Sequence, residues 1–167
     1  MKQVIFDIVD NIKLTDNVYK IRLAGDIADI TACGQFVNIK LDGLYLRRPI
    51  SVCDAENGIL TLIYKVVGKG TEQLADMQHG SLDLLVGLGN GYNTEVSGSK
   101  PLLLGGGVGV PPLYMLAKKL ISEGKKPTVV LGFNTESEVF YEKEFSALGA
   151  NVLVTTVDGT KGIKGFV

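Results

Sequence analysis

The sequence contains few residues of the kinds that bind metals or form disulfides. Its 167 residues include two cysteines, Cys33 and Cys53, and a single histidine, His79. The cysteines lie far apart and have no metal-ligand spacing around them, so we expect reduced thiols in a core and no metal site. Gln78-His79-Gly80 is typical of an exposed turn. We therefore expect no catalytic histidine, and we assign no catalytic side chain.

Net charge and long apolar runs are also lacking. The 17 Lys and Arg residues nearly balance the 18 Asp and Glu residues, which leaves a net charge of -1. This balance gives no electrostatic reason to expect binding to nucleic acid or to an anionic membrane. No segment approaches the roughly 20 apolar residues needed to cross a bilayer, and Met1–Asp7 does not resemble a secretory signal. We expect a soluble, cytoplasmic protein that acts on small molecules.

The first part of the chain is typical of an all-β domain. Between Lys2 and about Asn93, short β-branched runs alternate with turn residues. The expected strands span residues 3–8, 18–23, 35–41, 50–53, 60–66 and 81–86, with one short helix at 71–77. Asp42-Gly43 and Asn57-Gly58 are hairpin signals, and strands at such even spacing indicate a sandwich or a small barrel.

Beyond Lys100 the pattern becomes that of a parallel α/β domain. The expected strands span residues 102–104, 128–132 and 152–155, and the expected helices span 113–123 and 139–148. Residues 94–100 look like a linker, so we place the two domains at 1–96 and 97–167. Three strands are few for a nucleotide-binding sheet, and residues 162–167 suggest neither a final helix nor a closing strand. We therefore expect the second domain to be truncated at its C-terminus.

A glycine-rich turn in the second part predicts a phosphate site. It follows the buried strand and consists of Gly105, Gly106, Gly107, Val108 and Gly109. Glycines let the backbone approach a pyrophosphate, and the helix after them offers free N–H groups at the positive end of its dipole. Pro111 suits the first helical turn. The spacing differs from the usual dinucleotide fingerprint, so an ordinary strand-to-helix turn is the alternative.

A second group of motifs lies upstream and predicts an anion site. Arg48 precedes Pro49-Ile50-Ser51, and Ile63-Tyr64-Lys65 leads into a glycine turn that ends at Gly70 and Thr71. The planar donor fork of arginine suits phosphate, and the start of a short helix at Thr71 would offer a pyrophosphate N–H groups and the threonine hydroxyl. The alternative is structural: a solvated basic pair, a half-buried serine and a packed tyrosine.

Taken with Gly89-Asn90-Gly91, these motifs resemble the flavin-binding ferredoxin reductases. Within that group, the chain is similar over its whole length to the electron-transfer subunits of class B dihydroorotate dehydrogenase, because five motifs occur in the same order. The resemblance implies a Greek-key antiparallel β-barrel that binds FAD, followed by a partial Rossmann-like parallel α/β domain that binds a nicotinamide nucleotide.

The resemblance also implies which residues bind each cofactor. FAD contacts carried over by position fall on Arg48, Pro49, Ile50, Ser51, Ile63, Tyr64, Lys65, Gly70 and Thr71. Contacts to NAD(H) fall on Gly105, Gly106, Gly107, Val108, Gly109 and Pro111, with Asn134 and residues 156–159 as further walls. The Ser51 hydroxyl could bond near the reactive edge of the flavin, and Tyr64 could offer a flat face with a polar tip.

The chain departs from this family most clearly in what would carry electrons onward. The family holds a [2Fe–2S] cluster on a cysteine-rich segment, as such clusters require thiolate ligands, and the chain has no such segment. A smaller departure is Cys33, which stands where proline is usual before Gly34-Gln35-Phe36.

The resemblance implies a function in electron transfer. Electrons would pass from NADH to FAD and, in the complete protein, through a [2Fe–2S] cluster to the catalytic subunit of dihydroorotate dehydrogenase. That partner works in pyrimidine biosynthesis, and the implied assembly is a heterotetramer. Two alternatives stay open: a subunit like ferredoxin–NAD(P) reductase or sulfide dehydrogenase, and a non-catalytic flavin-binding scaffold.

Overall fold

The computed structural model describes all 167 residues, which form two compact units, Met1–Gly91 and Tyr92–Val167. The elements of the first unit are β1 (Lys2–Lys13), β2 (Val18–Ala24), β3 (Phe36–Ile39), β4 (Arg48–Glu56), β5 (Ile59–Lys65), α1 (Lys69–Asp76) and β6 (Ser81–Leu88). No helix in the chain is long and apolar enough to cross a membrane.

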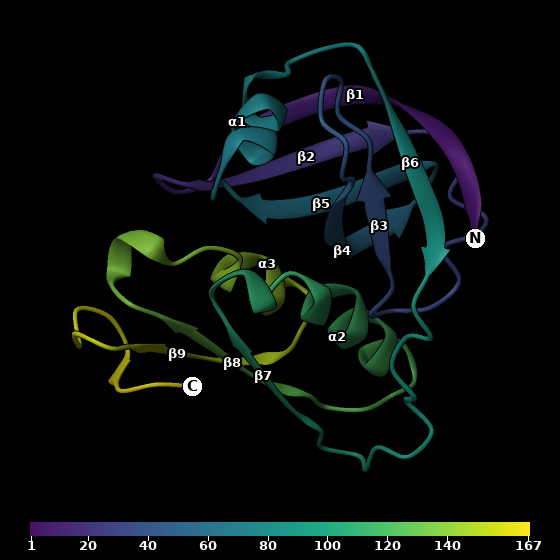
Figure 1. The fold of residues 1–167 in the computed structure, drawn as a ribbon. Coiled ribbons are helices and arrows are strands. Elements are labelled where there is room, and N and C mark those ends of the chain that lie inside the picture. The colour runs from purple at the N-terminus through teal and green to yellow at the C-terminus, as the bar shows by residue number, and fades with distance from the viewer. The chain divides into compact units, whose positions relative to one another are not determined.

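The six strands of the first unit close into an antiparallel barrel in the order β1-β2-β5-β4-β3-β6 (Figure 1). Alternate side chains point inward and form its core, as the period of two in a strand requires; Phe6, Ile21, Leu60 and Leu84 are fully buried. The all-β prediction is confirmed, and of the two arrangements expected, a sandwich or a small barrel, the structure shows the barrel. Both cysteines are buried thiols, as expected.

Strand β1 contains a bulge that reverses which side chains face the core. Ile8 pairs with Leu23 and Asp10 with Arg22, so Val9 is an extra residue on β1. Before the bulge Phe6 points inward; after it Asn11 does, and Asn11 is only 4% exposed. A bulge shifts the alternation by one residue. It therefore carries a polar side chain into the barrel, at a position that the sequence pattern did not predict.

The second unit is a four-stranded sheet with two helices. Its elements are β7 (Leu102–Gly106), α2 (Pro112–Ser122), β8 (Thr128–Phe133), α3 (Glu142–Ala147), β9 (Asn151–Thr156) and β10 (Ile163–Lys164), with 3-10 turns η1 (Gly107–Gly109) and η2 (Glu136–Glu138). The strands are parallel and lie in the order β10-β9-β8-β7. Figure 1 shows α2 and α3 on the same face of the sheet. The parallel α/β prediction is confirmed.

Two details of the second unit differ from the sequence-based prediction. The segment near the C-terminus does form a strand, because Ile163 and Lys164 pair with Thr155 and Thr156 on β9. The helix expected over residues 139–148 is shortened to α3 and is preceded by η2. Tyr141 adopts a left-handed φ of 66°. This turn packs Phe140 against Phe133 and Tyr141 against Tyr114, so tertiary packing overrides the helical pattern.

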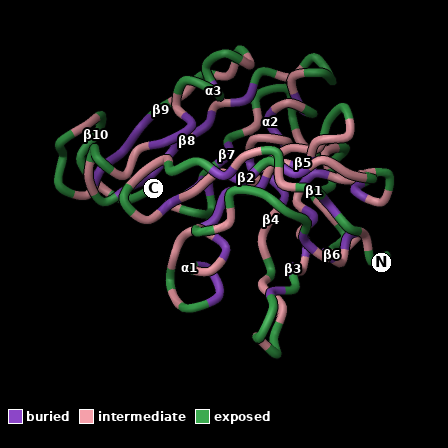
Figure 2. The backbone as a smooth tube through the Cα atoms, turned by 90° about the horizontal axis from the view of Figure 1, so that it is seen from above, coloured by how far each residue is buried: buried purple, intermediate pink, exposed green.

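The face of this sheet away from the two helices remains partly exposed. Leu102 and Leu104 on β7 and Leu153 on β9 are 60%, 57% and 40% exposed, whereas their neighbours Leu103 and Val154 are buried. Figure 2 shows the buried residues following the strands of each unit while the loops stay exposed. Parallel sheets are usually covered on both faces; here one face carries the core.

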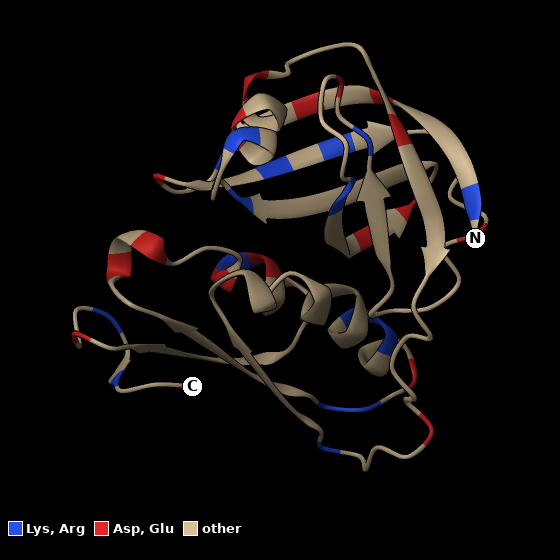
Figure 3. Ribbon diagram, viewed as in Figure 1, with Lys and Arg blue, Asp and Glu red and all other residues tan.

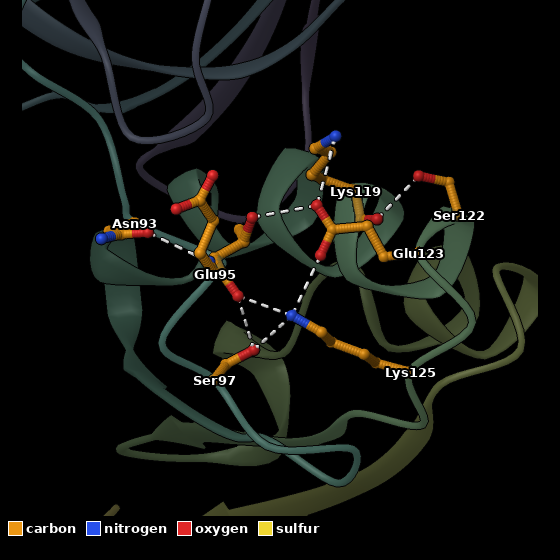
Figure 4. A network of polar contacts seen from close by, with 8 residues as sticks. Asn93, Glu95, Ser97, Lys119, Ser122, Glu123 and Lys125 are labelled. Atoms are coloured by element: carbon orange, nitrogen blue, oxygen red, sulfur yellow. Dashed lines mark hydrogen bonds and ion pairs between the residues drawn. The ribbon is translucent and has the colours of Figure 1, made fainter.

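The segment expected to be a linker belongs to the second unit and is fixed by an ionic network (Figure 4). Lys125 Nζ donates to the carbonyl of Thr94 (2.5 Å) and to Ser97 Oγ (2.8 Å), and lies 3.0 Å from a carboxylate oxygen of Glu123. Thr94 Oγ1 donates to the other oxygen of that carboxylate (2.9 Å). These bonds tie residues 94–97 to the end of α2.

Candidate functional site

The first part of the candidate site is the N-terminus of α1. Its first backbone bond runs from Glu72 N to the carbonyl of Gly68 (2.9 Å). The amides of Lys69, Gly70 and Thr71 therefore have no acceptor within the helix, as in the first turn of any helix. Free N–H groups at the positive end of a helix dipole are suited to bind an anion.

Thr71 shapes this helix start from inside. Its hydroxyl accepts hydrogen bonds from Val67 N (2.9 Å) and Gly68 N (3.2 Å) and donates to the carbonyl of Gly68 (2.9 Å). The residue is buried. Sequence reasoning offered this hydroxyl to a pyrophosphate; the structure instead commits it to the turn, so Thr71 presents its backbone amide.

Arg48 lies beside the same turn, although it comes from the start of β4. A Cβ built on Gly70 would stand 2.0 Å from Nε and 2.6 Å from Cζ of Arg48. The guanidinium thus occupies the space that any larger residue at position 70 would need. The structure brings together two motifs that are separate in the sequence, and their juxtaposition places a positive charge at the unpaired amides of α1.

The neighbouring arginines have different surroundings. Arg47 forms a bidentate pair with the carboxylate of Asp83, with contacts of 3.1 and 3.2 Å, and also donates to the carbonyls of Asn38 and Asp83. Arg48 donates only to the carbonyl of Leu46. Figure 3 shows Lys and Arg as well as Asp and Glu over the barrel unit, yet no carboxylate pairs with Arg48. Its charge remains available to an anion, whereas that of Arg47 is neutralised.

The β4–β5 ladder opens where the other motif residues lie. It runs from Glu56 and Ile59 to Val52 and Leu62 and ends there. Residues 48–51 then pair only with β3, and residues 63–65 pair only with β2. Backbone N–H and C=O groups on the facing edges are left without ladder partners, and a proline is tolerated beside such an edge. The backbones of residues 49–51 and 63–65 thus border an open seam in the β4–β5 ladder, whereas the side chain of Ile63 is buried (3% exposed).

Tyr64 does not offer its ring to this seam. It is 1% exposed and stacks on Tyr19, with ring centroids 5.9 Å apart. Its hydroxyl donates to Asn11 Oδ1 (3.0 Å), and burial raises its pKa to about 12. The expectation of a flat face toward a ligand is not met; at this position only the backbone borders the seam.

In the second unit, the glycine turn joins β7 to α2. A Cβ on Gly105 would lie 2.7 Å from Leu113 Cδ1 and 3.1 Å from Val110 Cα, so this glycine allows the helix to pack on the strand. Gly107 has a positive φ of 51°. Nothing lies within 4 Å of the Cβ positions of Gly107 and Gly109. The backbone of the turn is therefore bare on its outer side, at the N-terminal end of α2 where Pro111 and Pro112 follow.

The predicted wall residues gather at the same edge of the sheet. The carbonyl of Asn134, which follows β8, accepts from Asp158 N (3.2 Å) in the loop after β9, and Asn134 Nδ2 donates to Glu138 (2.8 Å). Bonds from the backbone amide and hydroxyl of Thr160 lower the pKa of Asp158. Parallel strands bind ligands beyond their carboxyl ends, and Gly105–Gly109, Asn134 and residues 156–159 all lie there.

Known proteins resemble this chain over nearly its whole length. No family model matches the chain. It is 45% identical over 176 aligned positions to the electron transfer subunit of dihydroorotate dehydrogenase B (NAD⁺) from Bacillus pumilus, covering 100% of the chain and 68% of the relative. The chain belongs to this family of electron-transfer subunits. The corresponding subunit of Fusobacterium nucleatum is 42% identical over 95% of the chain and 64% of its own length. The chain thus spans about two thirds of its relatives.

Solved structures place the family among ferredoxin reductase-type proteins. An NADH-dependent reduced ferredoxin-NADP oxidoreductase is 34% identical, with a TM-score of 0.85 over 96% of the chain and 59% of that protein. A ferredoxin NADP⁺ reductase from Neisseria gonorrhoeae shares the fold at 18% identity, with a TM-score of 0.86 over 100% and 74% of the two chains. The family is therefore of the oxidoreductase type, and the chain has the fold of ferredoxin reductase-type proteins.

Two buried polar side chains of this electron-transfer subunit were missed by sequence reasoning. Gln35 Oε1 accepts from Thr31 N (2.9 Å) and Ala32 N (3.1 Å), and its amide donates to the carbonyl of Gly89 (3.1 Å). Asn11 joins β1 to α1. Gln35 belongs to the Gly34-Gln35-Phe36 motif, and a polar residue at the start of an expected strand was a signal that could have identified it. Asn11 gave no signal, because only the bulge at Val9 turns it inward.

Proposed function

We propose that this chain is the flavin- and nucleotide-binding part of an electron-transfer subunit that carries electrons from NADH toward a dihydroorotate dehydrogenase. The observation that carries the proposal is the position of Arg48 against Gly70 at the free amides of α1. A guanidinium and a helix N-terminus that converge in this way suit the pyrophosphate of a dinucleotide such as FAD.

The residues of the first unit fit FAD. The amides of Lys69, Gly70 and Thr71, together with Arg48, would hold the pyrophosphate, and the space a Cβ would fill at Gly70 is reserved for the guanidinium. The unpaired edges of residues 49–51 and 63–65 would bond the polar rim of the isoalloxazine ring. Ser51, half-buried on β4, would add a hydroxyl. Bound FAD supplies the capacity to take up a hydride and release its two electrons singly.

The second unit fits the nicotinamide nucleotide. The bare outer side of Gly107 and Gly109 admits a phosphate to the backbone, and α2 turns its positive end toward it. The carboxylates of Glu138 and Asp158 stand with Asn134 at the ends of β8 and β9. A negative corner of this kind favours a free ribose hydroxyl over a 2′-phosphate, which supports NADH as the donor.

Transfer beyond the flavin is assigned to the whole protein. Thiolate ligands for a [2Fe–2S] cluster are not found in this chain, whose two cysteines are buried in the barrel unit. The names of the relatives support a catalytic dihydroorotate dehydrogenase partner. The cluster and a heterotetrameric assembly are proposed for the complete protein because the family resemblance implies them. No side chain of the chain is required to transfer a proton.

The half-reaction can be tested on the purified chain. We expect visible flavin bands after reconstitution with FAD, and we expect anaerobic NADH to bleach them. NADPH at the same concentration should be slower. Flavin bands that persist with both nucleotides would favour the alternative of a non-catalytic flavin-binding scaffold. A chain that never acquires the bands would overturn the proposal.

A second candidate is a reductase subunit that exchanges electrons between ferredoxin and NAD(P)H. It is favoured by the 34% identity to the NADH-dependent reduced ferredoxin-NADP oxidoreductase. Adding reduced ferredoxin to the reconstituted protein separates the two candidates. Flavin reduction by ferredoxin, together with no activity toward the dihydroorotate dehydrogenase catalytic subunit, would favour the second candidate.

A further inference from the structure

Asn11 is a buried polar residue outside every motif considered above. It lies on β1 and makes three hydrogen bonds, each of which reaches another element. Its Nδ2 donates to the carbonyl of Leu74 (2.7 Å) and to that of Met77 (3.0 Å), and its Oδ1 accepts from the Tyr64 hydroxyl (3.0 Å). One amide therefore joins β1, β5 and the end of α1.

The amide is held in one orientation. Tyr64 is almost wholly buried, and burial raises the pKa of its hydroxyl to about 12, so the hydroxyl carries its proton at neutral pH and can donate it in a hydrogen bond. The Tyr64 hydroxyl donates its proton to Asn11 Oδ1, so the oxygen of the amide must face Tyr64. The Nδ2 group then faces α1 and donates its two protons to the two carbonyls. Leu74 lies in the last turn of α1 and Met77 is its C-cap. Carbonyls at a helix end lack the usual intrahelical partners. The carbonyl of Leu74 accepts from Met77 N (3.2 Å), and Asn11 adds a side-chain donor to both carbonyls.

Helix α1 depends on such anchors. At eight residues it is shorter than the roughly 12–15 residues at which isolated helices become stable in water. Thr71 fixes its first turn through Val67 and Gly68. Leu74 packs into the barrel with no exposure. Asn11 fixes the other end by hydrogen bonds, and hydrogen bonds restrict orientation more than apolar contact does.

We propose that Asn11 is a positioning residue for the anion site: by bonding the C-terminal end of α1, it aims the free amides at the other end of the helix toward the place beside Arg48. The inference rests on the proposed function, because the anion it serves is the FAD pyrophosphate. The bulge at Val9 follows from the same account, since without the extra residue Asn11 would face outward.

The test compares two flavins in three variants. FAD carries the pyrophosphate, and riboflavin has the same ring system without it. Asn11→Leu keeps the approximate size of the side chain but removes both Nδ2 bonds, so the carbonyl of Leu74 keeps only the bond from Met77 N and the carbonyl of Met77 loses this donor. Tyr64→Phe keeps the Nδ2 bonds and frees the amide to rotate. The control for a general loss of barrel stability is Val86→Ala. Val86 lies on β6 and pairs with Lys2, at the end of β1 away from Asn11.

We expect Asn11→Leu to weaken FAD binding by about tenfold or more, with riboflavin binding changed by less than about twofold. Tyr64→Phe should shift the FAD-to-riboflavin ratio in the same direction, by about threefold. Val86→Ala should lower Tm and leave that ratio unchanged. Amide exchange over residues 69–76 should become faster in Asn11→Leu and not in Val86→Ala.

An unchanged FAD-to-riboflavin ratio in folded Asn11→Leu would overturn the inference, as would an equal weakening of both flavins. Where Asn11→Leu does not fold, an unchanged ratio in Tyr64→Phe would have the same consequence. Failure of the unaltered chain to bind FAD at all would overturn the proposed function, so the two failures are distinguishable.

Discussion

The guanidinium of Arg48 fills the space beside Gly70 in which a side chain would otherwise grow. A Cβ at that position would stand 2.0 Å from Arg48 Nε. The two residues are 22 positions apart in the sequence, yet they form one corner of the barrel, where a fixed cation meets the free amides of α1. The relationship explains why a strand motif and a helix-start motif occur together in this chain.

Gly70→Ala tests this relationship. The new methyl group must displace the end of a flexible side chain, and alanine is favoured over glycine within a helix, so we expect Tm to stay the same or rise slightly. FAD affinity should fall by about tenfold because Arg48 is pushed from the anion site. Calorimetry and an FAD titration check both parts. The control is Gly98→Ala, at a glycine with nothing within 4 Å of its Cβ position; a loss of FAD affinity there would count against the interpretation.

The adjacent arginines should separate binding from stability. Arg48→Ala removes charge-assisted hydrogen bonds worth about 1.5–3 kcal/mol, which corresponds to about tenfold or more in FAD affinity, with little effect on the free energy of unfolding. Arg47→Ala removes the ion-pair partner of Asp83, which keeps only the hydrogen bond from Gln3 Nε2 (2.8 Å), and should cost about 2 kcal/mol of stability. Denaturant unfolding and FAD titration of both variants would decide. The assignment fails should Arg48→Ala retain full flavin affinity.

The glycine turn of the second unit offers a similar pair. In Gly105→Ala the methyl group meets Leu113 and the backbone of Val110, and such overpacking should cost about 1–3 kcal/mol of stability. In Gly109→Ala it enters open space, so Tm should not change while the KM for NADH rises. Equal KM values for Gly109→Ala and the unaltered chain would show that the nucleotide does not approach this residue.

The network at residues 94–97 predicts a stability change in acid. Hydrogen bonds lower the pKa of Glu123 from 4.5 to about 2, and the bond from Lys125 has a larger effect than the bond from Thr94. A carboxyl group whose pKa is lower in the folded state stabilises the fold above its unfolded pKa, and that stabilisation is lost as pH falls through the folded value. We expect the loss between about pH 4.5 and pH 2. Unfolding curves of Glu123→Gln should lack this part of the pH dependence; identical profiles would contradict the account.

Periodicity and turn residues predicted most of the fold. All six barrel strands, the helix near Thr71 and the strand–helix–strand order of the second unit followed from short β-branched runs, hairpin glycines and the glycine turn at Gly105. These signals are local, and local signals are what a sequence shows. The strand pattern alone was compatible with a sandwich or a small barrel, and the structure shows the barrel.

What could not be predicted depends on contacts between distant residues. The left-handed Tyr141 follows from aromatic packing against α2, and strand β10 exists through its pairing with β9. Within the candidate site, the structure brings the segment of Arg48 beside that of Gly70, but the surroundings of single side chains differ from those expected. Thr71 and Tyr64 are bonded inside the unit, and Asn11 is turned inward by a one-residue bulge that no pattern of apolar residues records.

The central claim is that the first unit binds FAD through Arg48 and the start of α1. The most direct test is a titration of the flavin-free protein with FAD, monitored by flavin absorbance and by calorimetry. The same titration is done on Arg48→Ala. The account predicts saturation at one FAD per chain and a clear loss of affinity in the variant. Absence of saturable binding in the unaltered protein, or equal affinity in both proteins, would contradict it.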